Sequence, residues 1–178
     1  MADTERSKSA LLTLLADNTV GAISPQDLRD VLVSLINPFG SFYISSPAGT
    51  SITQSGTYVK AAGTTTANNL SSFTMPASNR LTYTGTATRH FHIATHLSFT
   101  SSTGNRVIGV QLAVDGTALP NSTHTVKIGT GSDTQAMSVH WDAMLSSNQY
   151  LELFITDTQG TNTITLSTGY LFALGMLI

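Results

Sequence analysis

The sequence contains no cysteine, few charged residues and no long apolar run. The absence of cysteine excludes a disulfide framework, a thiolate metal site and a cysteine nucleophile. Charged residues make up 10% of the chain and the formal net charge is −2, so we expect neither a nucleic-acid partner nor an anionic membrane surface. Because no stretch of about twenty apolar residues is present, we expect no membrane-spanning helix.

The N-terminus also lacks the pattern of a secretory signal. Met1–Glu5 is polar and acidic, and the apolar run Ala10–Leu15 is too short for such a signal. We therefore expect the chain to be made in a cytoplasm and to leave it, if at all, by lysis or assembly.

Serine and threonine are abundant and together make up roughly a quarter of the chain, above ordinary globular usage. The mean hydropathy is +0.10, so hydroxyl groups rather than charged groups must make the surface polar. This composition is typical of a β-rich protein with many short turns, often extracellular or part of a particle.

Residues 1–37 carry helical periodicity and predict a helical anchoring segment. Asp3 or Thr4 can cap a first helix, and Asp17-Asn18 would end it. The apolar residues of this helix are Leu11, Leu12, Leu14 and Leu15.

A second helix has a better-marked start. Ser24 is a candidate N-cap, Pro25 suits the first helical position, and Asp27 favours the positive end of the helix. Asn37-Pro38 is expected to end it. An apolar stripe at helical spacing comprises Leu28, Val31, Leu32, Leu35 and Ile36.

Two short helices cannot enclose a core of their own. Their apolar stripes must therefore pack on the chain's own β domain, on sister subunits or on another protein. The residues expected to dock on such a partner are Leu11, Leu12, Leu15, Leu28, Val31, Leu32 and Leu35.

Residues 38–178 predict one antiparallel β-sandwich, because short strand patterns follow one another with turn signals between them. The Asp115-Gly116 pair predicts a type I′ hairpin, and Gly63–Asn69 is expected to be a loop. The predicted strands are Phe39–Ile44, Thr57–Lys60, Arg80–Thr84, His90–Phe99, Arg106–Val114, His124–Ile128, Thr134–Trp141, Gln149–Asp157, Asn162–Ser167 and Gly169–Ile178.

The last of these strands, Gly169–Ile178, is apolar on both faces. In an antiparallel sandwich one face of each sheet normally contacts water. The outer face of this strand must therefore be covered, and a sister subunit is the usual cover.

Three segments resemble, in their order, the trimeric jelly roll of tumour necrosis factor and the globular head of the first complement component. They are Arg89–Leu97, Asn148–Ile155 and Ser167–Phe172, within a similarity that covers roughly Thr88–Ile178. The resemblance implies a jelly roll whose inner sheet contains all three segments, and three inner sheets that meet on a three-fold axis.

The resemblance also implies which side chains form the trimer interface. Where the family usually has aromatic residues in the first segment, this chain has His92, Ala94 and His96. The expected interface residues are His92, Ala94, His96, Tyr150, Glu152, Tyr170, Phe172, Leu174 and Met176.

The segment Asp17–Val31 is similar to the start of many tailed-phage virion proteins, in which the pattern DNTxGxISPxxLRDVxxSL precedes a variable β domain. Together the two resemblances imply a homotrimeric phage protein with a helical anchor and a displayed sandwich.

His90, His92 and His96 share one face of an alternating strand, as histidine pairs in metal sites do. The same pattern fits a polar strand face at an interface, which we favour over a structural metal or a trapped anion. We expect no metal and no cofactor.

Enzymatic chemistry has no candidate residues. The sequence has no Gly-x-Ser-x-Gly motif and no obvious pair of acidic residues, so we expect no enzyme, a polysaccharide-degrading one included. Glu152 is expected to meet an arginine or histidine across an interface. Trp141 fits either the core or a platform on which a glycan stacks.

The sequence therefore predicts a structural virion protein, a homotrimeric capsid decoration or cement protein or head fibre that docks on the major capsid protein. The alternative is the receptor-binding head of a tail fibre, with a host-surface glycan as its ligand.

Overall fold

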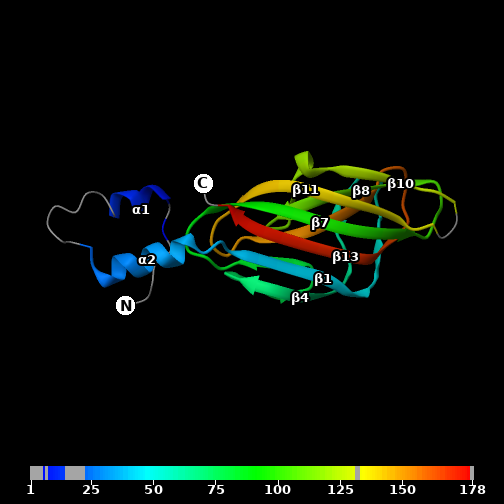
Figure 1. Cartoon of the computed structure of the whole chain (residues 1–178). Helices are drawn as coiled ribbons and strands as arrows, with labels where there is room; N and C mark the ends of the chain where they lie inside the picture. Colours follow the sequence, from blue (N-terminus) through cyan, green and yellow to red (C-terminus); the bar gives the residue numbers. More distant parts are fainter. Residues whose placement is uncertain (1–5, 7, 15–22, 131–132, 177–178) are drawn as a thin grey trace.

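The computed structural model describes residues 6, 8–14, 23–130 and 133–176. Two short helices precede a sandwich of two antiparallel sheets (Figure 1). The elements are α1 (Lys8–Leu14), α2 (Pro25–Leu35), β1 (Phe39–Pro47), β2 (Gly49–Ser51), β3 (Val59–Lys60), β4 (Gly63–Ser71), β5 (Phe73–Ala77), β6 (Arg80–Tyr83), β7 (Arg89–Ser101), β8 (Arg106–Val114), β9 (Thr117–Ala118), the 3-10 turn Pro120–Ser122, β10 (His124–Ile128), β11 (Gln135–Leu145), β12 (Tyr150–Asp157) and β13 (Thr163–Met176).

The first sheet has the strand order β11-β7-β13-β1-β4, with β2 paired to β13. The second sheet has the order β10-β8-β12-β6-β5, with β3 paired to β12 and β9 to β8. All these pairs are antiparallel. The mainly β architecture with a helical N-terminal segment is the one that the sequence predicted.

The core lies between the two sheets, and along β7 core-facing side chains alternate with outward ones. In β7 the side chains of Phe91, Ile93 and Leu97 are completely buried. The rings of Phe73, Tyr83 and Phe91 pack together, with centroids 4.9 to 5.4 Å apart. Such tilted and edge-to-face contacts suit the ring quadrupoles.

Helix α2 begins as its sequence predicts. Ser24 accepts a hydrogen bond from the backbone N–H of Asp27, and the Asp27 carboxylate accepts one from the backbone N–H of Ser24. This reciprocal capping box satisfies two N–H groups that a helix start otherwise leaves unpaired. The helix ends at Leu35, before Asn37 and Pro38.

The helices lie beyond one end of the sandwich, the end at which β1 begins and β13 finishes (Figure 1). Two hydrogen bonds tie the chain together there. Gly175 N–H donates to the carbonyl of Pro38 over 2.7 Å, and Arg89 Nη2 donates to the carbonyl of Ser34 over 2.9 Å. The second bond joins the last turn of α2 to the first residue of β7.

The hairpin prediction at Asp115-Gly116 is confirmed. Both residues have positive φ, 51° and 74°, as a type I′ turn requires. Val114 and Thr117 pair on either side of the turn.

Two predictions about strands are wrong. Gly63–Asn69 is part of strand β4 rather than a loop, and it pairs with β1 along the sheet edge. Its threonines and asparagines give no apolar alternation, because an edge strand buries few side chains. The segments Asn162–Ser167 and Gly169–Ile178 were predicted as separate strands, but Thr163–Met176 forms one continuous strand with a register shift between Leu166 and Thr168.

A candidate oligomerisation surface

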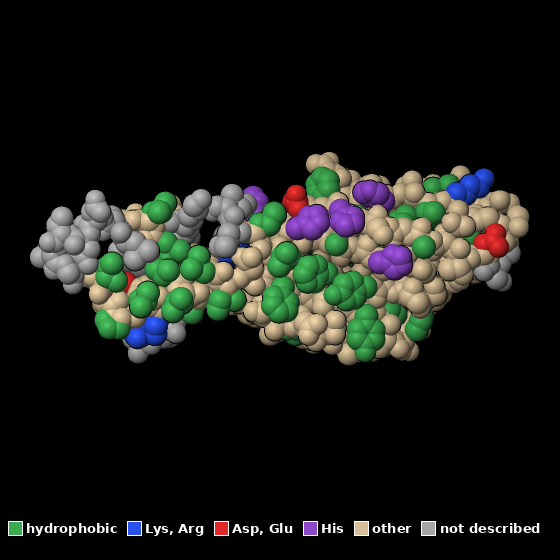
Figure 2. Space-filling model, viewed as in Figure 1, with side chains coloured by type: hydrophobic (Ala, Val, Ile, Leu, Met, Phe, Trp, Pro, Cys, Tyr) green, Lys and Arg blue, Asp and Glu red, His purple; other side chains and the backbone are tan. Residues whose placement is uncertain are grey.

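The outward side of the first sheet, here called the outer face, gathers apolar side chains and histidines (Figure 2). Strand β13 lies between β7 and β1, and β11 lies on the far side of β7. The outer face comprises Tyr43 of β1, Tyr170, Phe172, Leu174 and Met176 of β13, His90, His92, Ala94 and His96 of β7, and His140, Asp142 and Met144 of β11.

The strand register arranges these side chains in rows. Tyr170 lies opposite Tyr43 on one side and His96 on the other. Two rows further along, beyond Phe172, Leu174 lies opposite Phe39 and His92. The outer face therefore consists of an apolar strip on β13 and β1, bordered by imidazoles on β7.

The strip is solvent-exposed in a single chain. Tyr43 is 44% exposed, Tyr170 37% and Leu174 37%, although Leu171 and Ala173 on the other side of β13 are fully buried. The sequence prediction that β13 is apolar on both faces is thus confirmed. A strip of this kind, with large apolar side chains in one contiguous row, is typical of an interaction surface.

Four of the predicted interface residues of β13 and two of the histidines lie on the outer face, as does Ala94. His92 and His96 point away from the core, as predicted, and so does His90. Their neighbours His140 and Asp142 were not predicted, because the pairing of β11 with β7 cannot be read from either strand alone. Their alternation along Gln135–Leu145 was the one signal that could have shown them.

The histidines make polar contacts within the chain. His92 Nδ1 donates to Asp142 Oδ1 over 2.8 Å, and His92 Nε2 lies 3.3 Å from His140 Nδ1. With Trp141 these three residues line a hollow of about 300 Å³. Among the described residues, no group of three or more histidine, aspartate or glutamate side chains is arranged to hold a metal ion.

Tyr150 and Glu152 do not lie on the outer face, which corrects two predicted interface residues. Both belong to β12, and β12 pairs with β8 in the second sheet. The Asn148–Ile155 segment is therefore not in the sheet of the other two resembling segments. Alternation along a strand fixes which side chains face the core, but it does not fix the sheet that the strand joins.

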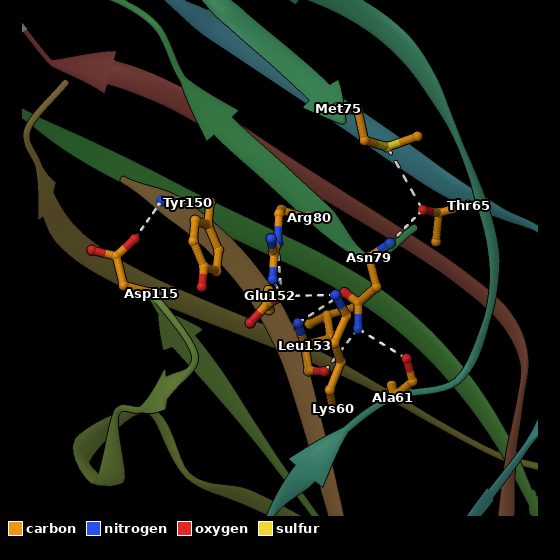
Figure 3. Close-up of polar contacts among 10 residues, drawn as sticks. All are labelled: Lys60, Ala61, Thr65, Met75, Asn79, Arg80, Asp115, Tyr150, Glu152 and Leu153. Carbon is orange, nitrogen blue, oxygen red and sulfur yellow. Dashed lines mark hydrogen bonds and ion pairs between the residues drawn. The ribbon is translucent and has the colours of Figure 1, made fainter. Parts of the chain in front are cut away.

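Glu152 forms an ion cluster within its own chain instead of meeting a partner. Its carboxylate is 2% exposed, and Oε1 accepts from Lys60 Nζ over 2.7 Å and from Arg80 Nε over 3.2 Å (Figure 3). The Arg80 guanidinium also lies 4.0 Å from the centroid of the Tyr150 ring. The two cations compensate the burial of the carboxylate.

Beside this cluster, the side chain of Asn79 takes the place of backbone hydrogen bonds at the edge of β12 in the second sheet. Its Nδ2 donates to the carbonyls of Ala61 and Leu153 over 3.1 and 2.9 Å, and its Oδ1 accepts from Leu153 N–H over 2.9 Å (Figure 3). The residue is 2% exposed and has a φ of 51°. Asparagine tolerates this left-handed conformation better than most residues.

The apolar stripe of α2 is the second exposed apolar surface. Leu28, Leu32 and Leu35 are 55%, 56% and 54% exposed, so these residues do not pack on the sandwich. On α1, Leu12 is 65% exposed. Of the other residues expected to dock on a partner, Leu11 and Val31 are half-buried. Leu15 lies outside the described residues, as do the predicted capping and ending residues of the first helix, Asp3, Thr4, Asp17 and Asn18.

Neither helix of the described residues is long and apolar enough to cross a membrane.

The sequence matches no protein-family model, and no curated protein is significantly similar to it. Solved structures of similar fold include murine APRIL at pH 8.5, with 10% identity, a TM-score of 0.50, and coverage of 79% of this chain and 100% of that one. Murine APRIL at pH 5.0 has 9% identity and a TM-score of 0.50, and the match covers 78% of this chain and 99% of that one. Eiger TNF from S. frugiperda has 9% identity and a TM-score of 0.49 over 78% of this chain and 93% of that one. The chain thus has a jelly roll like that of tumour necrosis factor.

Proposed function

We propose that the protein is a homotrimer in which three outer faces meet on a three-fold axis. The observation that carries this proposal is the apolar strip of Tyr43, Tyr170 and Leu174, which a lone chain leaves exposed to water, with the half-buried Phe172 between them. Because apolar area removed from water stabilises association by roughly 25 cal/mol per Å², covering this strip favours assembly. The trimeric jelly rolls that the sequence resembles associate through the corresponding face.

The trimer acts, we propose further, as a structural protein of a tailed-phage virion, a capsid decoration or cement protein or a head fibre, without enzymatic activity. Two features support this role. One is the similarity of Asp17–Val31 to the start of phage virion proteins. The other is a helical segment that extends beyond the sandwich with apolar side chains in solvent. The major capsid protein is the proposed docking partner.

The mechanism is mechanical. Each trimer presents three helical segments at one end of the sandwich, so a particle can hold it at three points at once. After the first contact, the other two form at a high effective concentration, which can raise the overall affinity by about a hundredfold or more over one contact.

Particle composition tests the virion role. Purified particles of a phage that encodes this chain should contain it after density-gradient separation, and cryo-electron microscopy should show three-fold density on the capsid surface. Absence of the chain from gradient-purified particles, with the chain recovered in the soluble lysate, would contradict the role.

A glycan-binding head of a tail fibre is the second candidate, and the hollow lined by His92, His140, Trp141 and Asp142 favours it. Its imidazoles and its carboxylate can exchange hydrogen bonds with sugar hydroxyls, while the Trp141 side chain packs against the core on the other side of β11. Binding of the isolated protein to a glycan array, lost on Asp142→Ala, would select this function. No binding to the array together with location on the capsid would select decoration.

A further inference from the structure

Helix α2 has its polar and apolar faces reversed relative to an ordinary surface helix. Asp30 and Ser34 are each 1% exposed, although Leu28, Leu32 and Leu35 are more than half exposed. At 100° per residue, the leucines lie opposite Asp30 and Ser34 around the helix axis. Surface helices normally bury the apolar side.

The polar face of α2 is closed by the chain's own N-terminal segment. Arg6 Nε donates to Asp30 Oδ2 over 2.9 Å, and Arg6 Nη2 lies 2.8 Å from the same oxygen. Arg6 N–H donates to Ser34 Oγ over 2.8 Å, and Gln26 Nε2 donates to Asp30 Oδ1 over 2.8 Å. These bonds fix α2 with its leucines directed away from Arg6.

The leucine stripe continues the apolar strip of the outer face. Phe39, four residues after the end of α2, pairs with Leu174, and Gly175 bonds to Pro38. The helix thus leaves the sandwich at the end of the strip. Figure 2 shows hydrophobic side chains of the helical segment and of the outer face on the same side of the molecule.

We propose that the occupant of the α2 stripe is the α2 stripe of two further copies of this chain. The three helices then form a parallel bundle on the three-fold axis that the outer faces share. Leu28, Leu32 and Leu35 are spaced by four and three residues, the spacing of core positions in a coiled coil. An eleven-residue helix is too short to persist alone, so packing against its copies would stabilise it.

This inference rests on the proposed homotrimer and narrows the surface for the particle. If sister copies cover the α2 stripe, the surface left to contact the particle is α1, where Leu12 is 65% exposed. The two helices then have different partners, α2 the sister chains and α1 the capsid.

Disulfide cross-linking in the full chain tests the bundle, because the sequence has no cysteine of its own. Leu32→Cys should give a cross-linked dimer under mild oxidation, since two of three thiols on an axis can pair. Leu12→Cys, the matched control on α1, should stay uncross-linked. Leu32→Glu should raise the trimer dissociation constant by about a hundredfold, because it places three charges on the axis. Leu12→Glu should leave that constant unchanged.

Three results would overturn the inference. If both cysteine variants form trimers and neither cross-links, the three α2 helices are apart in the trimer, and the proposed homotrimer still stands. If Leu32→Glu abolishes particle binding without changing the trimer dissociation constant, the α2 stripe binds the particle and not the sister chains. A monomeric wild-type chain would remove the proposed homotrimer and the bundle together.

Discussion

The side chain of Asn79 makes hydrogen bonds that a neighbouring strand would otherwise make. Its amide binds Ala61 and Leu153, which would otherwise hold unpaired backbone groups in the second sheet. No sequence pattern indicated this role, because Ser78-Asn79 is typical of an ordinary turn. The contact depends on two residues distant in sequence.

Asn79→Ala should lower the free energy of unfolding by about 3 kcal/mol, because it leaves the buried Ala61 carbonyl and the buried Leu153 N–H without partners. The measurement is urea unfolding at one fixed protein concentration, since association shifts apparent stability. The matched control is Asn105→Ala, at an exposed asparagine with a similar φ of 54°. That substitution should cost about 1 kcal/mol from backbone strain alone. Equal losses for the two variants would show that the amide contacts contribute nothing.

Glu152 was expected at an interface, and the structure places it in an intrachain cluster with Lys60 and Arg80. Glu152→Gln should therefore lower the free energy of unfolding by about 1 to 2 kcal/mol and leave the oligomeric state unchanged. Lys60 and Arg80 are about one-third exposed, so water can solvate them when the carboxylate is lost. Analytical ultracentrifugation and urea unfolding measure the two quantities. If Glu152→Gln dissociates the trimer without lowering the free energy of unfolding, Glu152 lies at the interface after all.

At the scale of elements, sequence reasoning worked where local chemistry decides the structure. Ser24, Pro25 and Asp27 predicted the start of α2, and Asp115-Gly116 predicted its turn, because each signal acts within a few residues. The same reasoning failed for β4, whose edge position is set by β1. It also divided β13 at Gly169, where the chain in fact continues through a register shift.

The capping box makes a prediction about pH. Hydrogen bonds from the backbone N–H and the hydroxyl of Ser24 hold the pKa of the Asp27 carboxyl below its ordinary value of 3.8. A depressed pKa means that the cap stabilises α2 above the ordinary value and loses that contribution as the pH falls through the folded value.

Carbon-13 NMR titration of the Asp27 carboxyl should therefore give a midpoint below 3.8 in the wild-type chain. Ser24→Ala should move the midpoint upward, because it removes the hydroxyl donor. Asp133→Asn, at an exposed residue outside the helices and strands and away from the cap, should leave the midpoint where it was. An unshifted wild-type midpoint would show that the capping box does not form in solution.

At the scale of the whole molecule, the sequence predicted which face of a strand is buried better than it predicted which strands pair. The alternation of Phe91 and Ile93 with His92 and Ala94 fixed the core side of β7 correctly, because burial of apolar side chains depends only on the pleat. The partners of each strand depend on contacts between distant segments. For that reason Asp142 was missed beside His92, and Tyr150 was assigned to the wrong sheet.

The central claim is that the outer face is the surface of a homotrimer. Leu174→Asp should break the trimer, because three carboxylates would be buried near the axis without partners. Leu70→Asp is the matched control, since Leu70 is 39% exposed and Leu174 37% exposed, and Leu70 lies on the edge strand β4 away from the apolar strip.

Native mass spectrometry of the full chain at micromolar concentration tests this claim most directly. The account predicts a mass of three times the 18.8 kDa of one chain for the wild type and for Leu70→Asp, and folded monomers or insoluble protein for Leu174→Asp. A wild-type chain that is folded and monomeric at that concentration, or a Leu174→Asp variant that remains a trimer, would contradict it.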